Sequence, residues 1–285
     1  MSAQLLEGSR VANAVLQELA QRVEALKARG ITPGLGTILV GSDGPSISYV
    51  RKKHETCAQV GIQSFNIELP ASASQADLLQ AVRDFNANPQ VDGFLIQYPV
   101  PAGFDFNEAL LLMDPDKDAD GLHPVNLGRL VLQEPGPIPC TPAGIQAMLE
   151  YYQIPVEGRE VVVVGRGPTL GRPLALLLTL KQPSANAAVT VVHSGVPNIA
   201  DYTRRADIVI AAAGSPSIVT PDMIKPGAVV ISGGITWEGK RLLPDVDEAV
   251  GEVAGWITPR LGGVGPTTVA MLLKNTVQAA EKRAA

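Results

Sequence analysis

The stretch VVVVGRGPTLG, residues 161–171, decides the fold of this 285-residue chain. Four consecutive valines predict a strand buried on both faces, as in a parallel sheet that helices cover on each side. The glycines after the valines predict a tight turn, and the apolar run LALLL at 174–178 predicts a helix directly behind it. A strand, a glycine-rich turn and a helix in this order are typical of nucleotide-binding α/β domains.

Gly165, Gly167 and Gly171 form the pattern G-x-G-x-x-x-G, which is one residue longer than the standard dinucleotide fingerprint. Residues without side chains let backbone amides and the helix N-terminus approach a pyrophosphate. A purely structural turn is the alternative. Because the pattern lies within repeated strand and helix segments, the sequence favours a cofactor site.

The end of the next predicted strand bears on the choice of cofactor. An acidic residue there would bind the ribose 2′-hydroxyl of NAD and repel the 2′-phosphate of NADP. The chain has His193-Ser194 at this place, and Arg166 in the glycine loop can reach a phosphate. The sequence therefore favours NADP. The alternative is a solvated Arg166 and a His193 that only caps the strand end.

Strand and helix signals alternate on both sides of this stretch, which predicts parallel βαβ units. A proline-rich connector at 134–139 marks the domain boundary, and Thr141-Pro142 predicts a helix N-cap followed by proline at the first helical position. The predicted strands cover 37–40, 65–69, 91–97, 161–164, 188–192, 208–210 and 229–231, and the predicted helices cover 9–29, 46–60, 75–86 and 267–285.

The predicted fold is α/β with two domains and a cleft between them. Residues 1–138 together with 267–285 form an N-terminal βαβ substrate domain. Residues 139–266 form a Rossmann-like, doubly wound cofactor domain.

Composition excludes several classes of function. The net charge of −5 argues against nucleic acid binding, which needs clustered excess Lys and Arg. The apolar runs are far shorter than the roughly 20 residues of a membrane span, and the N-terminus lacks a signal-peptide pattern, so we expect a cytoplasmic protein without membrane contact. The scattered cysteines, Cys57 and Cys140, fit a reducing compartment, and together with three scattered histidines they predict no protein-bound metal.

Five side chains in the first half are candidates for the reactive site. Tyr49 and Lys53 are four residues apart and share one helix face, although Lys53 also ends a basic run that could simply be solvated. Gln97 places a neutral amide at the carboxyl end of a strand, where open α/β sheets bind ligands, or else it is a turn residue. Asp118 and Asp120 belong either to the site or to a hydrophilic turn.

Five motifs in this order resemble the methylenetetrahydrofolate dehydrogenase/cyclohydrolase family over nearly the whole chain. They are YVRKK at 49–53, GFLIQYPVP at 93–101, KDADGLH at 117–123, PCTPAG at 139–144 and GGVGP at 262–266. The resemblance implies oxidation of 5,10-methylenetetrahydrofolate to 5,10-methenyltetrahydrofolate with NADP, followed by hydrolysis to 10-formyltetrahydrofolate. It also implies a homodimer formed through the cofactor domains.

The resemblance also implies roles for individual residues. Lys53 becomes the catalytic lysine, with a lowered pKa that suits proton transfer in the hydrolytic step, and Tyr49 stacks on the aromatic portion of the folate. Gln97 positions Lys53, and Asp120 anchors the pterin. The loop residues Gly265 and Pro266 line the same site. The implied cofactor contacts are Gly165, Arg166, Gly167, Gly171, His193, Ser194 and Ile235.

The chain departs from the family pattern near the cofactor. Gly167 stands where the family often has serine, VISGGIT at 230–236 replaces V-I-D-V-G-I-N, and TPRLGG at 258–263 replaces T-P-V-P-G-G. Two other functions are therefore kept as alternatives: a dehydrogenase of another small metabolite, and a nucleotide-binding regulator without catalysis. Turnover of a folate substrate separates both from the main hypothesis.

Overall fold

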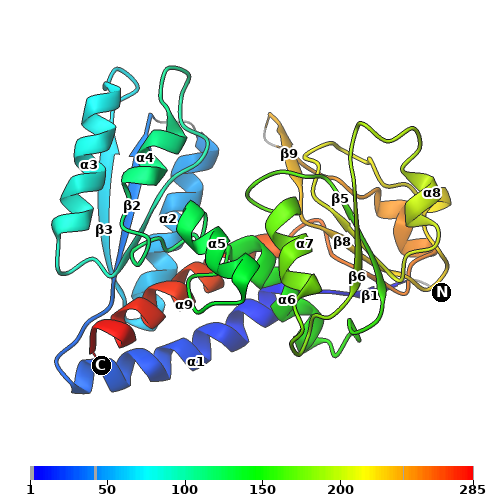
Figure 1. The fold of residues 1–285 in the computed structure, drawn as a ribbon, viewed down its shortest axis with the longest axis horizontal. Coiled ribbons are helices and arrows are strands. Elements are labelled where there is room, and N and C mark those ends of the chain that lie inside the picture. Colours follow the sequence, from blue (N-terminus) through cyan, green and yellow to red (C-terminus); the bar gives the residue numbers. More distant parts are fainter. Residues whose placement is uncertain (1–2, 42–43, 240, 285) are drawn as a thin grey trace. The chain divides into compact units, whose positions relative to one another are not determined.

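The computed structural model describes residues 3–41, 44–239 and 241–284 and divides into two compact units (Figure 1). The large-sheet unit comprises Met1–Asn13 and Pro139–Thr268, and the small-sheet unit comprises Ala14–Ile138 and Val269–Ala285. The sequence places the first residues with the first domain, whereas the structure groups them with the large sheet. The reason is strand pairing, because β1 (Gln4–Leu5) pairs with β11 (Trp256–Ile257).

The large-sheet unit contains a six-stranded sheet in the order β1-β11-β8-β7-β5-β6, among the described residues. Every neighbouring pair in this sheet is parallel. The order is that of a doubly wound fold, since the chain moves outward from β5 in both directions. The other four strands of this sheet are β5 (Glu160–Val164), β6 (Ala188–Val192), β7 (Ile208–Ala211) and β8 (Val229–Ser232).

The valine run of β5 is buried on both faces, as its composition predicts. Val161 and Val163 pack in one core with α6 (Cys140–Tyr151) and α7 (Gly171–Thr179). Val162 and Val164 point to the opposite face, because successive strand residues alternate. That second core also contains residues next to α8 (Ala200–Thr203), η1 (Pro221–Met223) and η2 (Glu248–Glu252).

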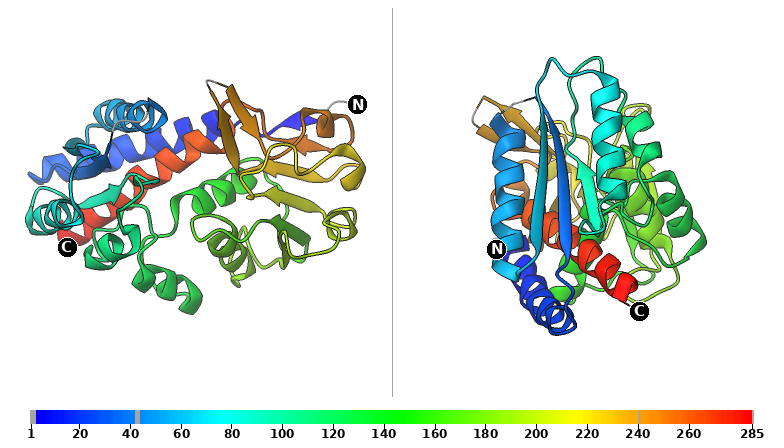
Figure 2. Two further views of the ribbon diagram at one scale, coloured as in Figure 1. Left: turned by 90° about the horizontal axis from the view of Figure 1, so that it is seen from above. Right: turned by 90° about the vertical axis from the view of Figure 1, so that its left-hand side faces the viewer.

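The small-sheet unit is built on the parallel sheet β3-β2-β4. Its strands are β2 (Gly34–Val40), β3 (Gln63–Leu69) and β4 (Gly93–Ile96), joined by the helices α2 (Gly44–Val60) and α3 (Gln75–Ala87). Figure 2 shows α2 and α3 on opposite faces of this sheet. Right-handed crossovers require that placement, because β3 and β4 flank β2 on opposite sides.

Several elements lie outside the sequence-based prediction. The helices α4 (Phe106–Leu112) and α5 (Pro124–Leu132) and the hairpin of β9 (Ile235–Glu238) and β10 (Arg241–Pro244) are short. The terminal helix α9 (Val264–Ala284) begins three residues before the expected start at 267. None of the helices described is long and apolar enough to cross a membrane.

The predicted N-cap at Thr141 is wrong. The N-cap of α6 is Pro139, and Thr141 already lies in the first helical turn. The cap position makes no side-chain hydrogen bond, and the Thr141 hydroxyl instead accepts a hydrogen bond from Thr268 Oγ1 at 3.2 Å. Thr141 therefore joins α6 to the start of α9 within the large-sheet unit.

Two ion pairs hold α9 in the small-sheet unit. Arg22 on α1 (Gly8–Ala28) donates to both carboxylate oxygens of Glu281 at 2.9 and 2.7 Å. Arg283 donates to Asp92, whose side chain is 2% exposed, at 2.7 and 3.3 Å. The Asp92 carboxylate also accepts from Gly34 N at the start of β2. Burial raises the pKa of Asp92, and the bonds from Gly34 and Arg283 oppose that shift.

Replacing Arg283 by methionine should lower the free energy of unfolding by about 2 kcal/mol, because the buried Asp92 carboxylate loses its cation. Lys282→Met is the matched control, since its ion pair with Asp116 is exposed and should contribute less than about 1 kcal/mol. Urea titrations followed by circular dichroism measure both variants. Equal stability of the two variants would contradict the assignment of α9 anchoring to Arg283.

Candidate active site

Lys53 is a buried cation that two other predicted site residues hold in place. Its Nζ donates to Gln97 Oε1 at 2.9 Å and lies 4.9 Å from the centroid of the Tyr49 ring. The side chain is only 5% exposed. An amide oxygen and an aromatic face both attract an ammonium group. The solvated alternative for Lys53 is therefore excluded by the geometry, and Tyr49, Lys53 and Gln97 form one cluster.

The sheet explains why these residues meet. β2 and β4 are parallel neighbours, with Ile38 opposite Ile96, so the segments after both strands leave the same edge of the sheet. α2 follows β2 and carries Lys53, while Gln97 follows β4 and donates its backbone N–H to Ile38 O. The Gln97 amide also donates from Nε2 to Tyr98 O, which directs Oε1 toward Lys53.

The charge of Lys53 acts on its neighbours on α2. Burial, followed by the positive charge of Lys53, lowers the pKa of His54. Burial raises the pKa of Cys57, one turn further along, to about 12, although Lys53 works in the opposite direction. Cys57 therefore stays a neutral thiol near neutral pH and is not a nucleophile. Lys53 thus remains the candidate reactive group of this helix.

The segment 117–123 runs beside β4 and places Asp120 near the same sheet edge. Asp118 forms a parallel bridge with Phe94, and Ala119 N donates to Phe94 O. Lys117 fixes the start of the segment, because its Nζ donates to three carbonyl oxygens at the end of α3. These belong to Phe85, Asn86 and Asn88, at 3.1, 2.9 and 2.8 Å.

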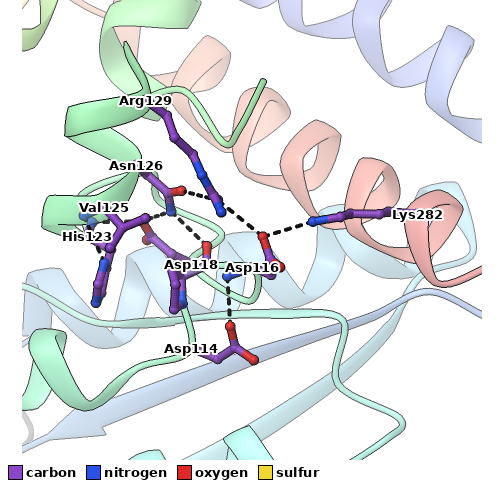
Figure 3. Close-up of polar contacts among 9 residues, drawn as sticks. Asp114, Asp116, Asp118, His123, Val125, Asn126, Arg129 and Lys282 are labelled. Atoms are coloured by element: carbon purple, nitrogen blue, oxygen red, sulfur yellow. Dashed lines mark hydrogen bonds and ion pairs between the residues drawn. The ribbon is translucent and has the colours of Figure 1, made fainter. Parts of the chain in front are cut away.

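Asp118 organises the turn at 118–123, and Figure 3 shows its contact with Asn126. The Asp118 side chain accepts from Gly121 N at 2.9 Å, from His123 N at 2.7 Å and from Asn126 Nδ2 at 2.9 Å. Asp118 is 1% exposed, whereas Asp120 is half-buried. The motif alone does not distinguish Asp118 from Asp120. In the structure it is Asp118 that holds the loop.

An outer layer of ion pairs supports this turn (Figure 3). Arg129 on α5 donates to Asn126 Oδ1 at 2.9 Å and to Asp116 Oδ1 at 3.1 Å. Lys282 on α9 approaches the same Asp116 oxygen at 3.0 Å. The hydrogen bond from Lys282, followed by that from Arg129, lowers the pKa of Asp116. α5 and α9 therefore both hold the loop that carries Asp120.

The glycine loop of the large-sheet unit requires glycine at two of its three positions. A Cβ added at Gly165, where φ is +127°, would lie 2.1 Å from Ala212 O, and one added at Gly171 would lie 2.3 Å from Gly165 O. An added Cβ at Gly167 meets no atom within 4 Å. α7 begins at Gly171 without a side-chain cap on its N-cap residue, Leu170. This backbone can therefore approach an anion closely.

Arg166 and His193 meet at the end of β6. Arg166 Nη1 lies 3.2 Å from His193 Nε2, and His193 Nδ1 accepts a hydrogen bond from Gly195 N at 3.0 Å. The guanidinium and the imidazole thus lie side by side, and an anion next to the pair could be bound there. Ser194, the next residue, is exposed.

The remaining predicted residues are placed more loosely. Ile235 begins β9 and is half-exposed. Gly265 and Pro266 lie in the first turn of α9, in the part of that helix that belongs to the large-sheet unit. Asp245 is a buried charge that escaped the sequence reasoning, and it accepts three backbone hydrogen bonds near the ends of β7 and β8. A single aspartate after a predicted loop gives no pattern from which to detect it.

Comparisons with known proteins identify two domains in the chain. Residues 6–120 match the model of the tetrahydrofolate dehydrogenase/cyclohydrolase catalytic domain, and residues 139–284 match that of the tetrahydrofolate dehydrogenase/cyclohydrolase NAD(P)-binding domain. The chain is 78% identical over 284 residues to the bifunctional protein FolD of Syntrophotalea carbinolica, an alignment that covers 100% of this chain and 98% of that protein.

Solved structures give the same assignment. The methylenetetrahydrofolate dehydrogenase-cyclohydrolase of Trypanosoma brucei, complexed with NADP and an inhibitor, superposes with a TM-score of 0.94 at 39% identity and covers 100% of this chain and 99% of that one. The bifunctional FolD enzyme of Campylobacter jejuni superposes with a TM-score of 0.94 at 38% identity, over 99% of this chain and 100% of that one. The chain therefore belongs to the tetrahydrofolate dehydrogenase/cyclohydrolase family.

Proposed function

We propose that this chain oxidises 5,10-methylenetetrahydrofolate to 5,10-methenyltetrahydrofolate with NADP and then hydrolyses the product to 10-formyltetrahydrofolate. Family membership supports the reaction class. The observation that carries the proposal is the buried Lys53 ammonium, held between Gln97 Oε1 and the Tyr49 ring. A buried amine at the ligand-binding edge of a parallel sheet suits proton transfer to a bound substrate.

The folate is assigned to the small-sheet unit. The Tyr49 ring offers an aromatic face for stacking, and the Asp120 carboxylate can accept hydrogen bonds from pterin N–H groups. Asp118 keeps the Asp120 loop fixed through its bonds to Gly121 and His123. The assignment of Gly265 and Pro266 to the folate rests on their motif alone.

NADP is assigned to the large-sheet unit, and the residues present fit it. Gly165 and Gly171 keep the loop tight, because backbone oxygens occupy the positions of their missing Cβ atoms, and Gly167 leaves open space where a pyrophosphate could approach the backbone, with the N-terminus of α7 at the same loop. Arg166, His193 and Ser194 suit a 2′-phosphate, because their N–H and O–H groups gather at the end of β6. Gly167 and Ile235 complete the proposed contacts.

The hydride step asks the protein mainly for orientation. When bound, the nicotinamide supplies the hydride acceptor. The stacked Tyr49 ring and the Asp120 anchor hold the methylene carbon in one pose, and the fixed loop of Asp118 limits its movement. In this step Lys53 contributes position and charge rather than a covalent bond.

The hydrolytic step needs proton transfer. Water adds to the cationic methenyl carbon and loses one proton; the hydroxyl group so formed then loses its proton as the carbonyl forms, while the bond from that carbon to N5 breaks and N5 gains a proton. The step gives 10-formyltetrahydrofolate and releases one proton overall. Lys53 Nζ is the group assigned to carry these protons, and Gln97 Oε1 keeps Nζ directed at 2.9 Å.

The direct test mixes purified protein with methylenetetrahydrofolate and NADP, then NAD, and follows the absorbance of the reduced cofactor. The decay of methenyltetrahydrofolate without cofactor is measured separately. Turnover in both assays supports the proposal and identifies the cofactor. Decay of the methenyl compound alone would mean cyclohydrolase activity without dehydrogenase activity. No turnover in either assay would favour a non-catalytic regulator.

Lys53→Ala should lose cyclohydrolase activity by about 100-fold or more while dehydrogenase activity falls by less than about tenfold, because only hydrolysis needs the amine for proton transfer. Lys52→Ala removes the same charge from the exposed neighbour and should leave both rates near wild type. Steady-state kcat values for the two reactions measure the split. Equal loss of both activities in Lys53→Ala would contradict this division of roles.

Arg166→Gln should raise the KM for NADP by about 10- to 100-fold and leave the KM for NAD nearly unchanged, since it removes a charged bond to the 2′-phosphate. Arg159→Gln is the control, because Arg159 precedes the same strand, β5, at its opposite end and is exposed. Initial rates at varied cofactor concentration measure the ratio. A parallel rise in both KM values would show that Arg166 does not select the phosphate.

The assembly proposed for this chain is a cytoplasmic homodimer formed through the large-sheet units. β6 lies at the edge of the six-stranded sheet. Val191 on β6 and Leu176 on α7 are each 36% exposed, which leaves apolar surface at that edge. An edge strand with apolar neighbours favours association with a second copy. Light scattering of the purified protein measures the mass directly.

A further inference from the structure

Asp245 is a fully buried carboxylate that binds only backbone groups in the described part of the chain. Its residue exposure is 0%. Oδ2 accepts from Ala213 N at 2.7 Å and from Gly214 N at 2.9 Å, and Oδ1 accepts from Ser215 N at 2.9 Å. Three successive N–H groups that converge in this way form a backbone nest for an anion. The chain fills this nest with its own side chain.

The three N–H groups lie at the edge of the sheet where the glycine loop also lies. β5 and β7 are parallel neighbours, with Val164 opposite Ala211, so their following segments leave the sheet together. Ala212 O is the atom that an added Cβ at Gly165 would approach at 2.1 Å. The turn bound by Asp245 therefore begins in direct contact with the glycine loop.

Asp245 also fixes a second turn, the one that follows β8. Gly233 N and Gly234 N both donate to Ala211 O, and Asp245 N donates to Ser232 Oγ at 3.1 Å. A Cβ at Gly234 would lie 2.0 Å from Asp245 Oδ2, so the backbone of this turn packs directly on the carboxylate. One side chain thus joins the segments that leave β7 and β8.

The physical cost of this arrangement is high. Burial raises the pKa of Asp245, and the bonds from Ala213, Gly214 and Ser215 oppose that shift. Burying a carboxylate that only backbone N–H groups bind costs free energy, so a role in stability alone does not account for it. An anion held here, however, also denies the nest to the phosphates of a nucleotide. Because the Asp245 carboxylate occupies the nest, the phosphates of a nucleotide at this edge would bind at the glycine loop instead.

We propose that Asp245 is a positioning residue for the nicotinamide cofactor. By holding 213–215 and 233–234 at the carboxyl edge of β7 and β8, it shapes the backbone surface on which the nucleotide lies. It acts through these two turns and does not touch the cofactor. This inference rests on the proposed function, because it requires a nicotinamide nucleotide at the edge that carries the glycine loop.

The test compares Asp245→Asn with Asp247→Asn. In Asp245→Asn an NH₂ group replaces one carboxylate oxygen and faces backbone donors, so the nest loses an acceptor. We expect the KM for NADP to rise by about tenfold or more and dehydrogenase kcat to fall. Cyclohydrolase activity measured without cofactor should stay within about twofold of wild type. Asp247 caps η2 through its bond to Ala249 N, so Asp247→Asn removes the same charge outside the nest and should match wild type in both assays.

Two outcomes would overturn the proposal. Wild-type dehydrogenase kinetics in Asp245→Asn would show that the nest does not affect the cofactor. Equal loss of both activities, with a lowered Tm, would show a purely structural role. A wild-type protein that fails to oxidise methylenetetrahydrofolate would instead overturn the proposed function, and cofactor binding measured by fluorescence of NADPH then tests Asp245 separately.

Ser232→Ala decides the question if Asp245→Asn does not fold. This change removes the hydroxyl that accepts from Asp245 N but keeps the carboxylate and its three bonds. The KM for NADP should rise by about two- to fivefold, with cyclohydrolase activity unchanged. An unchanged KM in this variant would overturn the proposal.

Discussion

Parallel strand pairing is the constraint on which both sites depend. Parallel neighbours send their following segments to the same edge of a sheet, so residues distant in sequence meet there. In the small sheet the pairing of β2 with β4 brings Lys53 and Gln97 within 2.9 Å. In the large sheet the pairing of β5 with β7 brings the glycine loop against Ala212. The order of the strands therefore determines which residues meet at each site.

The buried charges at these edges are held by different kinds of partner. Lys53 lies between a neutral amide oxygen and an aromatic ring. Asp118 and Asp245 are held by two and three backbone N–H groups, respectively, and these bonds use the carboxylates for structure. Asp92 has a cationic partner, Arg283, and lies away from the proposed chemistry.

Much of the fold could be predicted from local patterns, because strongly periodic segments indicate helices and β-branched runs indicate strands. The valine run of 161–164 and the long helices behaved as such patterns predict. Short elements were missed, since seven residues such as those of α4 carry too little periodicity. The placement of β1 was missed because two residues pair with a strand about 250 positions away, a contact that no local pattern encodes.

The candidate site was predictable only to the extent that motifs mark it. Spacing on one helix face indicated Tyr49 with Lys53, but nothing in the spacing placed Gln97 opposite them, because that contact depends on the sheet. The motif presented Asp118 and Asp120 as equivalent, and the difference between them emerged from hydrogen bonds across the turn. Asp245 had no motif at all, since its partners are backbone groups with no sequence signature.

The departures from the family pattern are compatible with a working cofactor edge. At Gly167 an added Cβ meets open space, so the loop keeps its shape whether or not a side chain stands there. At Ser232 the hydroxyl is already used, accepting from Asp245 N and donating to Gly234 O at 3.3 Å. Both substitutions therefore alter contacts at the edge of the sheet while the strands, the glycine loop and the nest keep their backbone. If the cofactor binds at this edge as proposed, such changes should affect its affinity rather than the backbone at which its phosphates would lie.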